Sequence, residues 1–438
     1  MSVSGGAVAG SRVVIVGGGV IGVCCAYFLA KRGAHVLLLD RERIAAGASS
    51  GNAGVIAPGH LPLVKPGGLW SLLKTVVRPS SPLYVAPRLD FELWKWLLML
   101  ARRFHEQTAE AAMRALAPLA RESLRLYGEL VAGEGIECGF RASGYYEVWR
   151  GSSGAREAEQ QVAFARRHGF SAEVLEPAEM LRRAPRLRGG LTCAVHHRDA
   201  ATLDPYAFVT GLAERAGAAR AKFQVAKVTE LLLAGDRVRG VRTEQGDEIG
   251  ADAVVVAAGA WSADLLRPLG FSLPLQPAKG YHSDLVDERS PHPFIPEALL
   301  LAERLVFVTP MGDRVRLAGT LEFSGLDLRI REGRWRQLAR AAAEYCQGVE
   351  GTRSISRWCG LRPCLPDGLP AIGPVAEIAG LYLATGHAMA GMTLGPVTGR
   401  LIADWCLAGS RPSQPPALDP ARFGRKAEDQ YFGTEGST

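Results

Sequence analysis

Two short apolar runs near the N-terminus flank a glycine-rich turn and a longer apolar segment. Residues 12–16 read RVVIV, residues 20–31 are almost all apolar, and residues 35–40 form a second short run that ends in an acid. Short β-branched runs are typical of buried strands, whereas the longer segment suits a buried helix that Gly33 ends. The pattern predicts a strand–helix–strand unit with two parallel strands.

Helical patterns follow in two further places. Residues 90–135 have apolar positions at helical spacing, and we expect them to interrupt the first unit as an inserted helical segment. Asp204 is a favourable cap and Pro205 a favourable first residue for a helix that runs to about Gly217. A last apolar helix is predicted from about Pro396 to Leu407.

Strand patterns dominate the region after residue 220. Residues 225–233 and 237–243 flank a short polar turn as a hairpin, and residues 253–257 form an apolar strand that returns to the first unit. Residues 273–330 alternate between apolar and polar positions, which is typical of an antiparallel sheet. We therefore expect this sheet to lie outside the first unit and to carry the substrate site.

Length and composition indicate a globular enzyme. With 438 residues, 47% of them apolar, the chain is long enough for about two domains. The net charge of +7 admits anionic partners such as a membrane surface or an acidic substrate. Arginine and lysine are spread along the whole chain rather than clustered, so nucleic-acid binding is not expected.

The cysteines and the N-terminal segment bear on the compartment. The eight cysteines show no Cys-x-x-Cys spacing, so we predict neither a disulfide framework nor a metal site. No secretory signal is recognised. This observation and the cysteine spacing together favour a reducing, cytoplasmic compartment. Residues 13–30 are uncharged and long enough for a membrane span, but the glycines after a short strand argue against one.

The glycine-rich turn carries a dinucleotide-binding fingerprint. Gly17, Gly19 and Gly22 follow a predicted strand and open a predicted helix, and Asp40 ends the next strand at the expected distance. The first glycine allows a tight turn, the second lets backbone N–H groups reach a pyrophosphate, and the third permits close helix packing. Asp40 would accept from ribose hydroxyls and disfavour NADP. The motif alone does not choose between NAD and FAD.

A second glycine-rich segment, residues 47–54 (GASSGNAG), favours FAD over NAD because of a resemblance to a known family. With the fingerprint, it resembles the start of the FAD-dependent amino-acid oxidoreductases, the family of D-amino acid dehydrogenases, D-amino acid oxidases and glycine oxidases. Residues 254–259 and 360–393 extend the resemblance over nearly the whole chain. It implies a bound, non-covalent FAD, with small residues letting backbone amides approach the flavin. The implied cofactor-binding residues are Gly17, Gly19, Val20, Ile21, Gly22, Asp40, Arg41, Ser49, Ser50, Asn52, Ala53, Gly54, Val225, Ala258, Gly259, Trp261, Gly391, Met392 and Thr393.

Arg362 is the leading candidate for substrate binding. It stands in Gly360-Leu361-Arg362-Pro363, which resembles the family segment that carries the arginine for the substrate carboxylate. A guanidinium can hold a carboxylate through two parallel hydrogen bonds and so fix the Cα hydrogen over the flavin. The alternative role is a surface ion pair. Backbone groups of residues 391–393, in the glycine-rich run before the last helix, would act as a helix start or an amide nest and stabilise the negative charge that develops on the flavin.

Two further residues are candidates for the catalytic site, each with an alternative. Tyr281 either donates to the substrate carboxylate or packs within the sheet, because the register of its strand is open. His387 either lines the site or packs structurally. Some relatives attach the flavin through a cysteine near the arginine segment, but alignment places Gly360 at that point, so the nearby cysteines are expected only to pack.

We therefore predict an α/β protein with a Rossmann-like FAD-binding domain and an inserted substrate domain built on a mixed or antiparallel sheet. The FAD-binding domain is expected to comprise residues 1–85, 171–265 and 352–438. The substrate domain is expected to comprise residues 86–170 and 266–351.

The resemblance implies a dehydrogenase that oxidises the Cα–N bond of a D-amino acid or cyclic D-imino acid by hydride transfer to flavin N5. D-Proline or D-hydroxyproline is the preferred substrate, and no dedicated protein base is required. Two alternatives stay open. One is an oxygen-using oxidase of glycine or sarcosine, and the other is a non-catalytic flavin-binding subunit for electron transfer, against which Arg362 argues.

The electron acceptor is a separate matter. Dehydrogenases of this type often pass electrons to a quinone, and a helix over residues 94–104 could touch a membrane through its Trp, Leu, Lys and Arg side chains. The alternative is an ordinary amphipathic helix that covers the core. We expect a cytoplasmic protein, with peripheral contact to the inner membrane as the open question.

Overall fold

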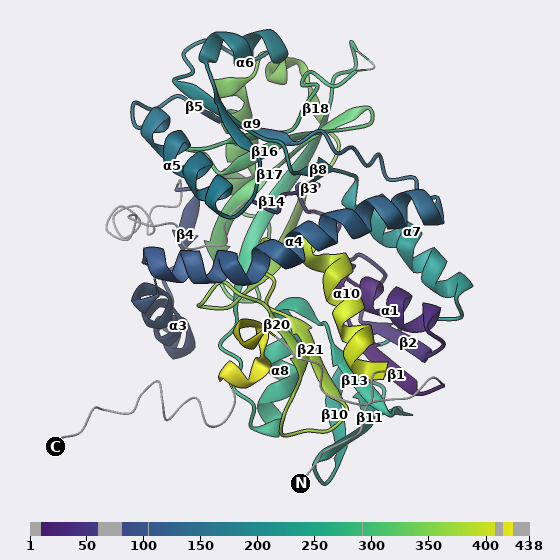
Figure 1. Cartoon of the computed structure of the whole chain (residues 1–438). Helices are drawn as coiled ribbons and strands as arrows, with labels where there is room; N and C mark the ends of the chain where they lie inside the picture. The colour runs from purple at the N-terminus through teal and green to yellow at the C-terminus, as the bar shows by residue number, and fades with distance from the viewer. Residues whose placement is uncertain (1–9, 60–80, 104, 291, 408–414, 424–438) are drawn as a thin grey trace, which may run out of the picture.

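The computed structural model describes residues 10–59, 81–103, 105–290, 292–407 and 415–423. Its two large sheets lie one above the other (Figure 1). A six-stranded sheet carries the N-terminal unit and the C-terminal helix, and a ten-stranded sheet carries most of the middle of the chain.

The six-stranded sheet is built on the predicted strand–helix–strand unit. β1 (Arg12–Val16), α1 (Val20–Lys31) and β2 (His35–Asp40) confirm the three predicted elements. The strand order is β20-β21-β13-β1-β2-β9, and every pair is parallel except β20 with β21. The other strands are β9 (Lys222–Val225), β13 (Ala253–Val256), β20 (Ala371–Pro374) and β21 (Leu381–Thr385).

Both faces of this sheet are buried, which explains its continuous apolar runs. Val13 and Ile15 of β1 pack on the side of α1, α7 (Pro205–Ala218) and α10 (Gly391–Leu407). Val14 and Val16 pack on the opposite side, against a three-stranded antiparallel sheet. The strands of that small sheet are β10 (Val228–Ala234), β11 (Arg237–Thr243) and β12 (Glu248–Gly250).

Two predicted boundaries were wrong. Val225 ends β9, where it pairs with Asp40, and the hairpin strand starts only at Val228. The last helix begins at Gly391 rather than Pro396. Proline cannot donate to the carbonyl four residues before it. The carbonyl of Met392 instead accepts a hydrogen bond of 2.5 Å from the Tyr127 hydroxyl, so the helix continues through the proline.

The ten-stranded sheet confirms the antiparallel pattern predicted for residues 273–330. β14, β17, β16 and β15 pair antiparallel in that order, and the path continues through β5, β7 and β6. β18 and β19 both pair with β14, and β4 pairs with β17. The bounds are β4 (Leu83–Val85), β5 (Tyr145–Trp149), β6 (Ala172–Leu175), β7 (Cys193–His197), β14 (Gln276–Val286), β15 (Leu299–Leu301), β16 (Val306–Met311), β17 (Arg314–Phe323), β18 (Arg353–Ser354) and β19 (Trp358–Cys364).

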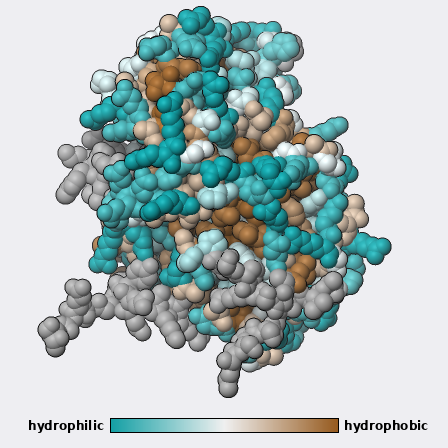
Figure 2. All heavy atoms as spheres, viewed as in Figure 1, coloured by the Kyte–Doolittle hydropathy of each residue, from teal (hydrophilic) through white to brown (hydrophobic). Residues whose placement is uncertain are grey.

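The predicted helical segment forms two helices, α3 (Phe91–Arg102) and α4 (Glu106–Glu134). α4 crosses the molecule between the two sheets and contacts α10 (Figure 1). Apolar side chains show at the surface around α10, between hydrophilic residues (Figure 2). The remaining elements are α5 (Gly154–Arg167), α6 (Pro177–Arg183), α8 (Ser262–Leu266), α9 (Glu332–Tyr345), the short pair β3 (Val55–Ile56) and β8 (Ala201–Thr202), and 3₁₀ turns at Gly259–Trp261, Arg267–Leu269, Val349–Gly351, Pro416–Leu418 and Pro420–Phe423. Within the described residues, no helix has both the length and the apolar content that a membrane span requires.

The strands divide between the two sheets at positions other than the predicted domain limits. β6 and β7 lie in the range assigned to the FAD-binding domain, yet they pair next to β5 in the ten-stranded sheet. β19, near the start of the range 352–438, pairs with β14 in the same sheet. Short apolar strands do not reveal which distant partner they join. The division into two domains itself stays a prediction.

Candidate functional site

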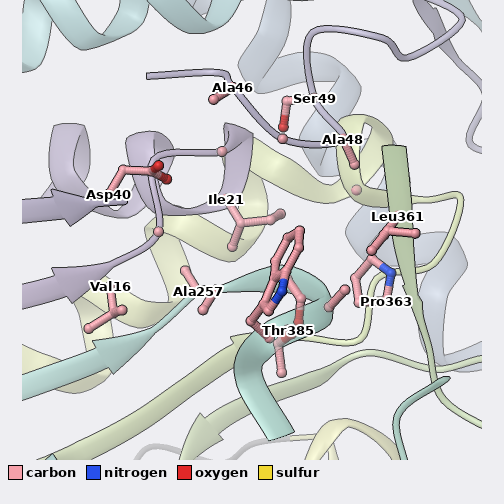
Figure 3. A pocket seen from close by; sticks show the side chains of 18 of the residues that line it. Val16, Ile21, Asp40, Ala46, Ala48, Ser49, Ala257, Leu361, Pro363 and Thr385 are labelled. Carbon is pink, nitrogen blue, oxygen red and sulfur yellow. Dashed lines mark hydrogen bonds between the residues drawn. The ribbon is translucent and has the colours of Figure 1, made fainter. Parts of the chain in front are cut away.

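A single long cleft runs from the carboxyl ends of β1, β2 and β13 to β19 of the ten-stranded sheet, and it encloses about 1760 Å³ including its open mouth. Figure 3 shows Asp40 and Ile21 on one wall and Leu361 and Pro363 on the facing wall. Ligands of open α/β sheets bind at the carboxyl ends of the strands. The cleft therefore joins the predicted dinucleotide site to the predicted substrate segment.

The turn between β1 and α1 has no room for side chains. Gly17 has a φ of +115°, and a Cβ atom there would lie 2.4 Å from the carbonyl oxygen of Ala257. A Cβ atom at Gly22 would lie 1.9 Å from the carbonyl oxygen of Gly17. These contacts give physical reasons for both glycines: a backbone conformation that favours glycine, and a close approach of helix to strand.

Asp40 and Ser49 secure the start of α1. One carboxylate oxygen of Asp40 accepts from the N–H of Gly18 at 2.7 Å, and the other accepts from Glu42 at 2.9 Å. The Ser49 hydroxyl accepts from the N–H of Val20 at 2.9 Å. Both side chains also line the cleft, so each keeps capacity for a ligand beside its structural hydrogen bond.

Most of the predicted cofactor-binding residues meet in this one cleft. The lining includes Gly17, Gly19, Val20, Ile21, Asp40, Arg41, Ser49, Asn52, Ala258, Gly259, Trp261, Gly391 and Met392. The Arg41 guanidinium stacks over the Trp261 ring, 3.7 Å from its centroid. The first residues of α10 stand at the cleft, so the positive end of the helix dipole faces it.

The other predicted cofactor-binding residues lie outside the lining, at Gly22, Ser50, Ala53, Gly54, Val225 and Thr393. Gly54 has a φ of +75° and lies against Leu203. The Thr393 hydroxyl accepts from the N–H of Ala57. Val225 is 67% exposed at the sheet edge, while its neighbour Ala226 lines the cleft.

Trp358 is a lining residue that the sequence analysis did not name. Its ring stacks on His282 with centroids 4.9 Å apart. A Cβ atom at Gly51 or at Gly360 would lie 2.3 Å from its indole, so the two glycines make room for one side chain. The only signal in the sequence was the pair of glycines in two distant segments, and nothing there indicated a common neighbour.

Arg362 lies in the cleft wall with its guanidinium over Gly280 of the adjacent strand. A Cβ atom at Gly280 would lie 2.1 Å from Nη1 of Arg362, and that nitrogen donates to the Thr320 carbonyl at 3.0 Å. Burial lowers the pKa of the guanidinium below its ordinary value. Within the described residues no carboxylate forms an ion pair with it. An uncompensated cation at a cleft wall is suited to an anionic ligand.

Tyr281 does not lie where the catalytic prediction requires it. It is buried on the face of the sheet that packs against α9, and its hydroxyl donates to the Glu322 carboxylate at 2.8 Å. β14 is buried on both faces, so alternation within the strand did not show which face Tyr281 would take. Tyr281 is therefore not among the cleft residues, and its packing role is the one that the structure shows.

His387 both lines the cleft and packs. Its Nε2 atom lies 3.0 Å from the Thr398 hydroxyl, and burial lowers the pKa of the imidazole to about 3. The ring is therefore neutral near pH 7. It can take part in a hydrogen bond in the cleft, but it cannot supply a positive charge there.

The two cysteines near the arginine segment lie outside the lining. Cys359 donates from its sulfur to the Leu328 carbonyl at 3.0 Å, and burial raises the pKa of the Cys364 thiol to about 12. Gly360, by contrast, lines the cleft. Among the described residues no group of three His, Cys, Asp or Glu side chains could hold a metal ion.

Comparisons with known proteins agree with this geometry. The model of the family described as DAO, FAD dependent oxidoreductase, matches residues 12–405. This chain belongs to the FAD-dependent oxidoreductase family. The residues present fit FAD, because the glycine turn, the Asp40 carboxylate and the start of α10 line one cleft, where backbone N–H groups suit a pyrophosphate and a carboxylate suits ribose hydroxyls.

Several relatives of this FAD-dependent oxidoreductase are known. A protein named D-amino acid dehydrogenase from Methylobacterium nodulans is 33% identical over 405 residues, which cover 90% of this chain and 94% of the relative. Another of that name, from Bradyrhizobium diazoefficiens, is 32% identical over 92% of this chain and 96% of its own length. The solved structure of glycine oxidase from Geobacillus kaustophilus has a TM-score of 0.76 at 25% identity, covering 94% of this chain and 99% of that one. The predicted fold class and the predicted FAD are thereby confirmed.

The neutral state of His387 makes the stability of this oxidoreductase depend on pH. The pKa of His387 is lowered to about 3 in the folded protein, whereas an unfolded histidine has a pKa of about 6.5. Between these values the unfolded chain binds one more proton, so stability falls as the pH drops below about 6.5, by up to about 1.4 kcal/mol per pH unit from this residue. We expect His387→Gln to remove that part of the slope in urea unfolding with FAD in fixed excess.

The exposed His35 offers a control. His35→Gln should keep the wild-type dependence of unfolding on pH. An unchanged slope in His387→Gln would show that this imidazole takes up protons while the protein is folded.

Proposed function

We propose that this FAD-dependent oxidoreductase is a dehydrogenase of D-amino acids and that Arg362 holds the substrate carboxylate. One observation carries the proposal: a guanidinium with no carboxylate partner in the described part of the chain stands in the wall of a cleft that fits FAD. The names of the curated relatives support the substrate class. Within that class, the resemblance described above leads us to prefer a cyclic D-imino acid such as D-proline or D-hydroxyproline.

The residues of the cleft suggest how they assist the reaction. Bound FAD supplies the acceptor for the hydride that leaves the substrate Cα. Arg362 fixes the orientation of the substrate through its carboxylate. The start of α10 places positive potential at the cleft. His387, neutral at pH 7, contributes no charge. The amine is then oxidised in its neutral form, and we assign no protein base.

The decisive experiment is an anaerobic titration of the purified yellow protein with a panel of D- and L-amino acids. Bleaching of the flavin by D-amino acids, with D-proline among the best, is the expected result. Bleaching by none of the panel would contradict the proposal. Acid precipitation should release the flavin into solution, because we propose a non-covalent FAD.

The acceptor is tested by the same preparation under air. The likeness to the solved glycine oxidase favours a second candidate, an oxidase that reduces oxygen. We propose instead a quinone or another acceptor. Rapid reoxidation by a quinone analogue with little hydrogen peroxide would support the dehydrogenase, and stoichiometric peroxide would support the oxidase.

Arg362→Lys should weaken substrate binding strongly. Lysine keeps the positive charge but loses the two parallel donors of the guanidinium. We expect kcat/KM to fall by about 10²-fold or more, which corresponds to about 3 kcal/mol of lost transition-state binding. Steady-state kinetics with the best amino acid, and with the corresponding amine that lacks a carboxylate, measure the effect. A similar loss for both compounds would contradict a carboxylate-binding role.

Gly280→Ala tests the position of the same guanidinium. The new methyl group would occupy the space of the guanidinium end, which is flexible enough to move, so the protein should fold while Arg362 is displaced. We expect KM to rise about tenfold, with FAD content unchanged. Gly128→Ala, in α4 with open space around the added methyl group, is the matched control. Unaltered KM in Gly280→Ala would show that the guanidinium does not bind substrate from this position.

We also propose peripheral membrane contact through α3. Phe91, Trp94 and Leu98 stand 78%, 58% and 49% exposed at helical spacing, while Leu93 and Trp96 of the same helix are buried. An exposed stripe with Trp is typical of helices that lie in a membrane interface. The end of the predicted range, Phe104, lies outside the described residues.

The double variant Trp94→Ser, Leu98→Ser should lose co-sedimentation with vesicles of anionic phospholipid, because the apolar contact is removed. Amino-acid oxidation with a soluble acceptor should be retained. The control is Leu326→Ser, an exposed apolar residue outside α3. Equal co-sedimentation of all variants, or none by the wild type, would contradict membrane contact through α3.

A further inference from the structure

The segment of residues 47–54, here called the cofactor loop, presents a row of backbone donors beside the cleft. The N–H groups of Ala48, Ser49, Ser50 and Gly51 have no acceptor among the described residues. Three of these residues line the cleft. Successive unpaired N–H groups in a turn form a favourable site for phosphate or carbonyl oxygens.

The carbonyl groups of the same loop are bound from the opposite direction, by side chains of the ten-stranded sheet. Nη1 of Arg316, on β17, donates to the carbonyl oxygens of Ser50 at 2.7 Å and of Asn52 at 3.1 Å. Nδ1 of His282, on β14, lies 3.2 Å from the carbonyl oxygen of Gly51. Three consecutive carbonyls are thus held by two side chains.

Arg316 is itself fixed by a buried carboxylate. Its Nε and Nη2 atoms donate to the two oxygens of Asp284 at 2.7 and 2.9 Å, and both side chains are more than 90% buried. Burial would raise the pKa of Asp284, but the hydrogen bonds and charge of Arg316 outweigh it, and the pKa lies below its ordinary value. The carboxylate therefore stays ionised and holds the guanidinium in one orientation.

His282 is held in its neutral form. Burial, followed by the charge of Arg316, lowers its pKa to about 4. A neutral imidazole has one N–H donor, and with the acceptor at Gly51 that donor is Nδ1. The His282 ring also stacks on the indole of Trp358, which lines the cleft. The contacts from the sheet thus reach the cleft wall at two points.

Stability alone is a weak explanation for such a network. A buried ion pair costs several kcal/mol in desolvation per ion and often contributes no more than well-packed apolar residues would. Its use here is orientation, because a planar guanidinium with fixed donors can hold two carbonyls and a carboxylate at once. A lysine ammonium has three donors, one fewer than the four oxygens to which Arg316 donates.

We propose that Arg316 is a positioning residue for FAD. By binding the carbonyls of the cofactor loop, it keeps the loop's N–H groups turned to the cleft and available to the cofactor. Asp284 and His282 complete this arrangement. The inference depends on FAD binding, which the family shows, and not on the identity of the amino-acid substrate.

The test compares two neighbouring arginines that share one carboxylate. Arg314 also forms an ion pair with Asp284, at 3.3 Å, and a second ion pair with Asp204. Within the described residues no hydrogen bond joins Arg314 to the cofactor loop. We expect Arg316→Gln to raise the Kd of FAD for the apoprotein by about tenfold or more. A change of this size corresponds to the loss of at least one charge-assisted hydrogen bond. Arg314→Gln should stay within about twofold of the wild type.

Three measurements separate positioning from folding. Thermal unfolding of the apoproteins should show similar losses for the two variants, whereas FAD fluorescence quenching should separate them. The visible spectrum of the bound flavin should shift only in Arg316→Gln. Equal Kd values for Arg316→Gln and the wild type, or an equal loss in both variants, would overturn the proposal.

If Arg316→Gln does not fold, the Kd of FAD is measured with Arg316→Lys instead. Its retained charge should preserve the pairing with Asp284 while it leaves at least one loop carbonyl unbound, so a Kd between those of the wild type and the glutamine variant is expected. A wild-type Kd and spectrum in Arg316→Lys would equally overturn the proposal. Failure of amino-acid oxidation with normal FAD binding would instead concern the proposed function.

Discussion

The close approach of α1 to the turn after β1 is the contact on which the site depends. A single carbon at Gly22 would meet the carbonyl of Gly17, and one at Gly17 would meet the carbonyl of Ala257, directly after β13. Because no side chain intervenes, the helix start, the end of β2 and the end of β13 meet at one point, and the cleft opens there. Asp40 and Ser49 then bind the first N–H groups of the turn and helix, which fixes the geometry further.

Two arginines of the ten-stranded sheet lie at or behind the cleft wall, and they differ in whether a carboxylate balances their charge. Arg316 has a buried carboxylate partner, and its Nη1 atom donates to the backbone of the cofactor loop. Arg362 donates to one carbonyl and has no carboxylate partner among the described residues. A compensated charge can hold a loop in place, whereas an uncompensated one favours an arriving anion. One sheet thus supports both the cofactor side and the proposed substrate side of the reaction.

The sequence predicted best where one local pattern decided the structure. The runs around Gly17, Gly19 and Gly22 combine strong apolar signals with turn chemistry, so β1, α1 and β2 were placed at their observed bounds. Arg362 was found through the resemblance of its segment to the family segment that carries the arginine for the substrate carboxylate. β9 was missed because it has only 4 residues, most of them exposed, which left Val225 in the wrong strand.

Features that depend on several distant strands were beyond reach. The face on which Tyr281 lies could not be predicted, because β14 is buried on both faces and its sequence shows no apolar alternation to distinguish them. The contacts of Arg316 join β17, β14 and the cofactor loop, and Trp358 occupies space left by two separate glycines. Such sites arise from pairing between strands far apart in sequence.

The central claim is that the Arg362 guanidinium receives the carboxylate of the substrate beside FAD. A crystal structure of the FAD-loaded protein with benzoate, a carboxylate that cannot be oxidised at Cα, tests it most directly. We expect both benzoate oxygens at about 2.7–2.9 Å from the guanidinium nitrogens of Arg362. Benzoate bound elsewhere in the cleft, with Arg362 still bonded only to the Thr320 carbonyl, would contradict it.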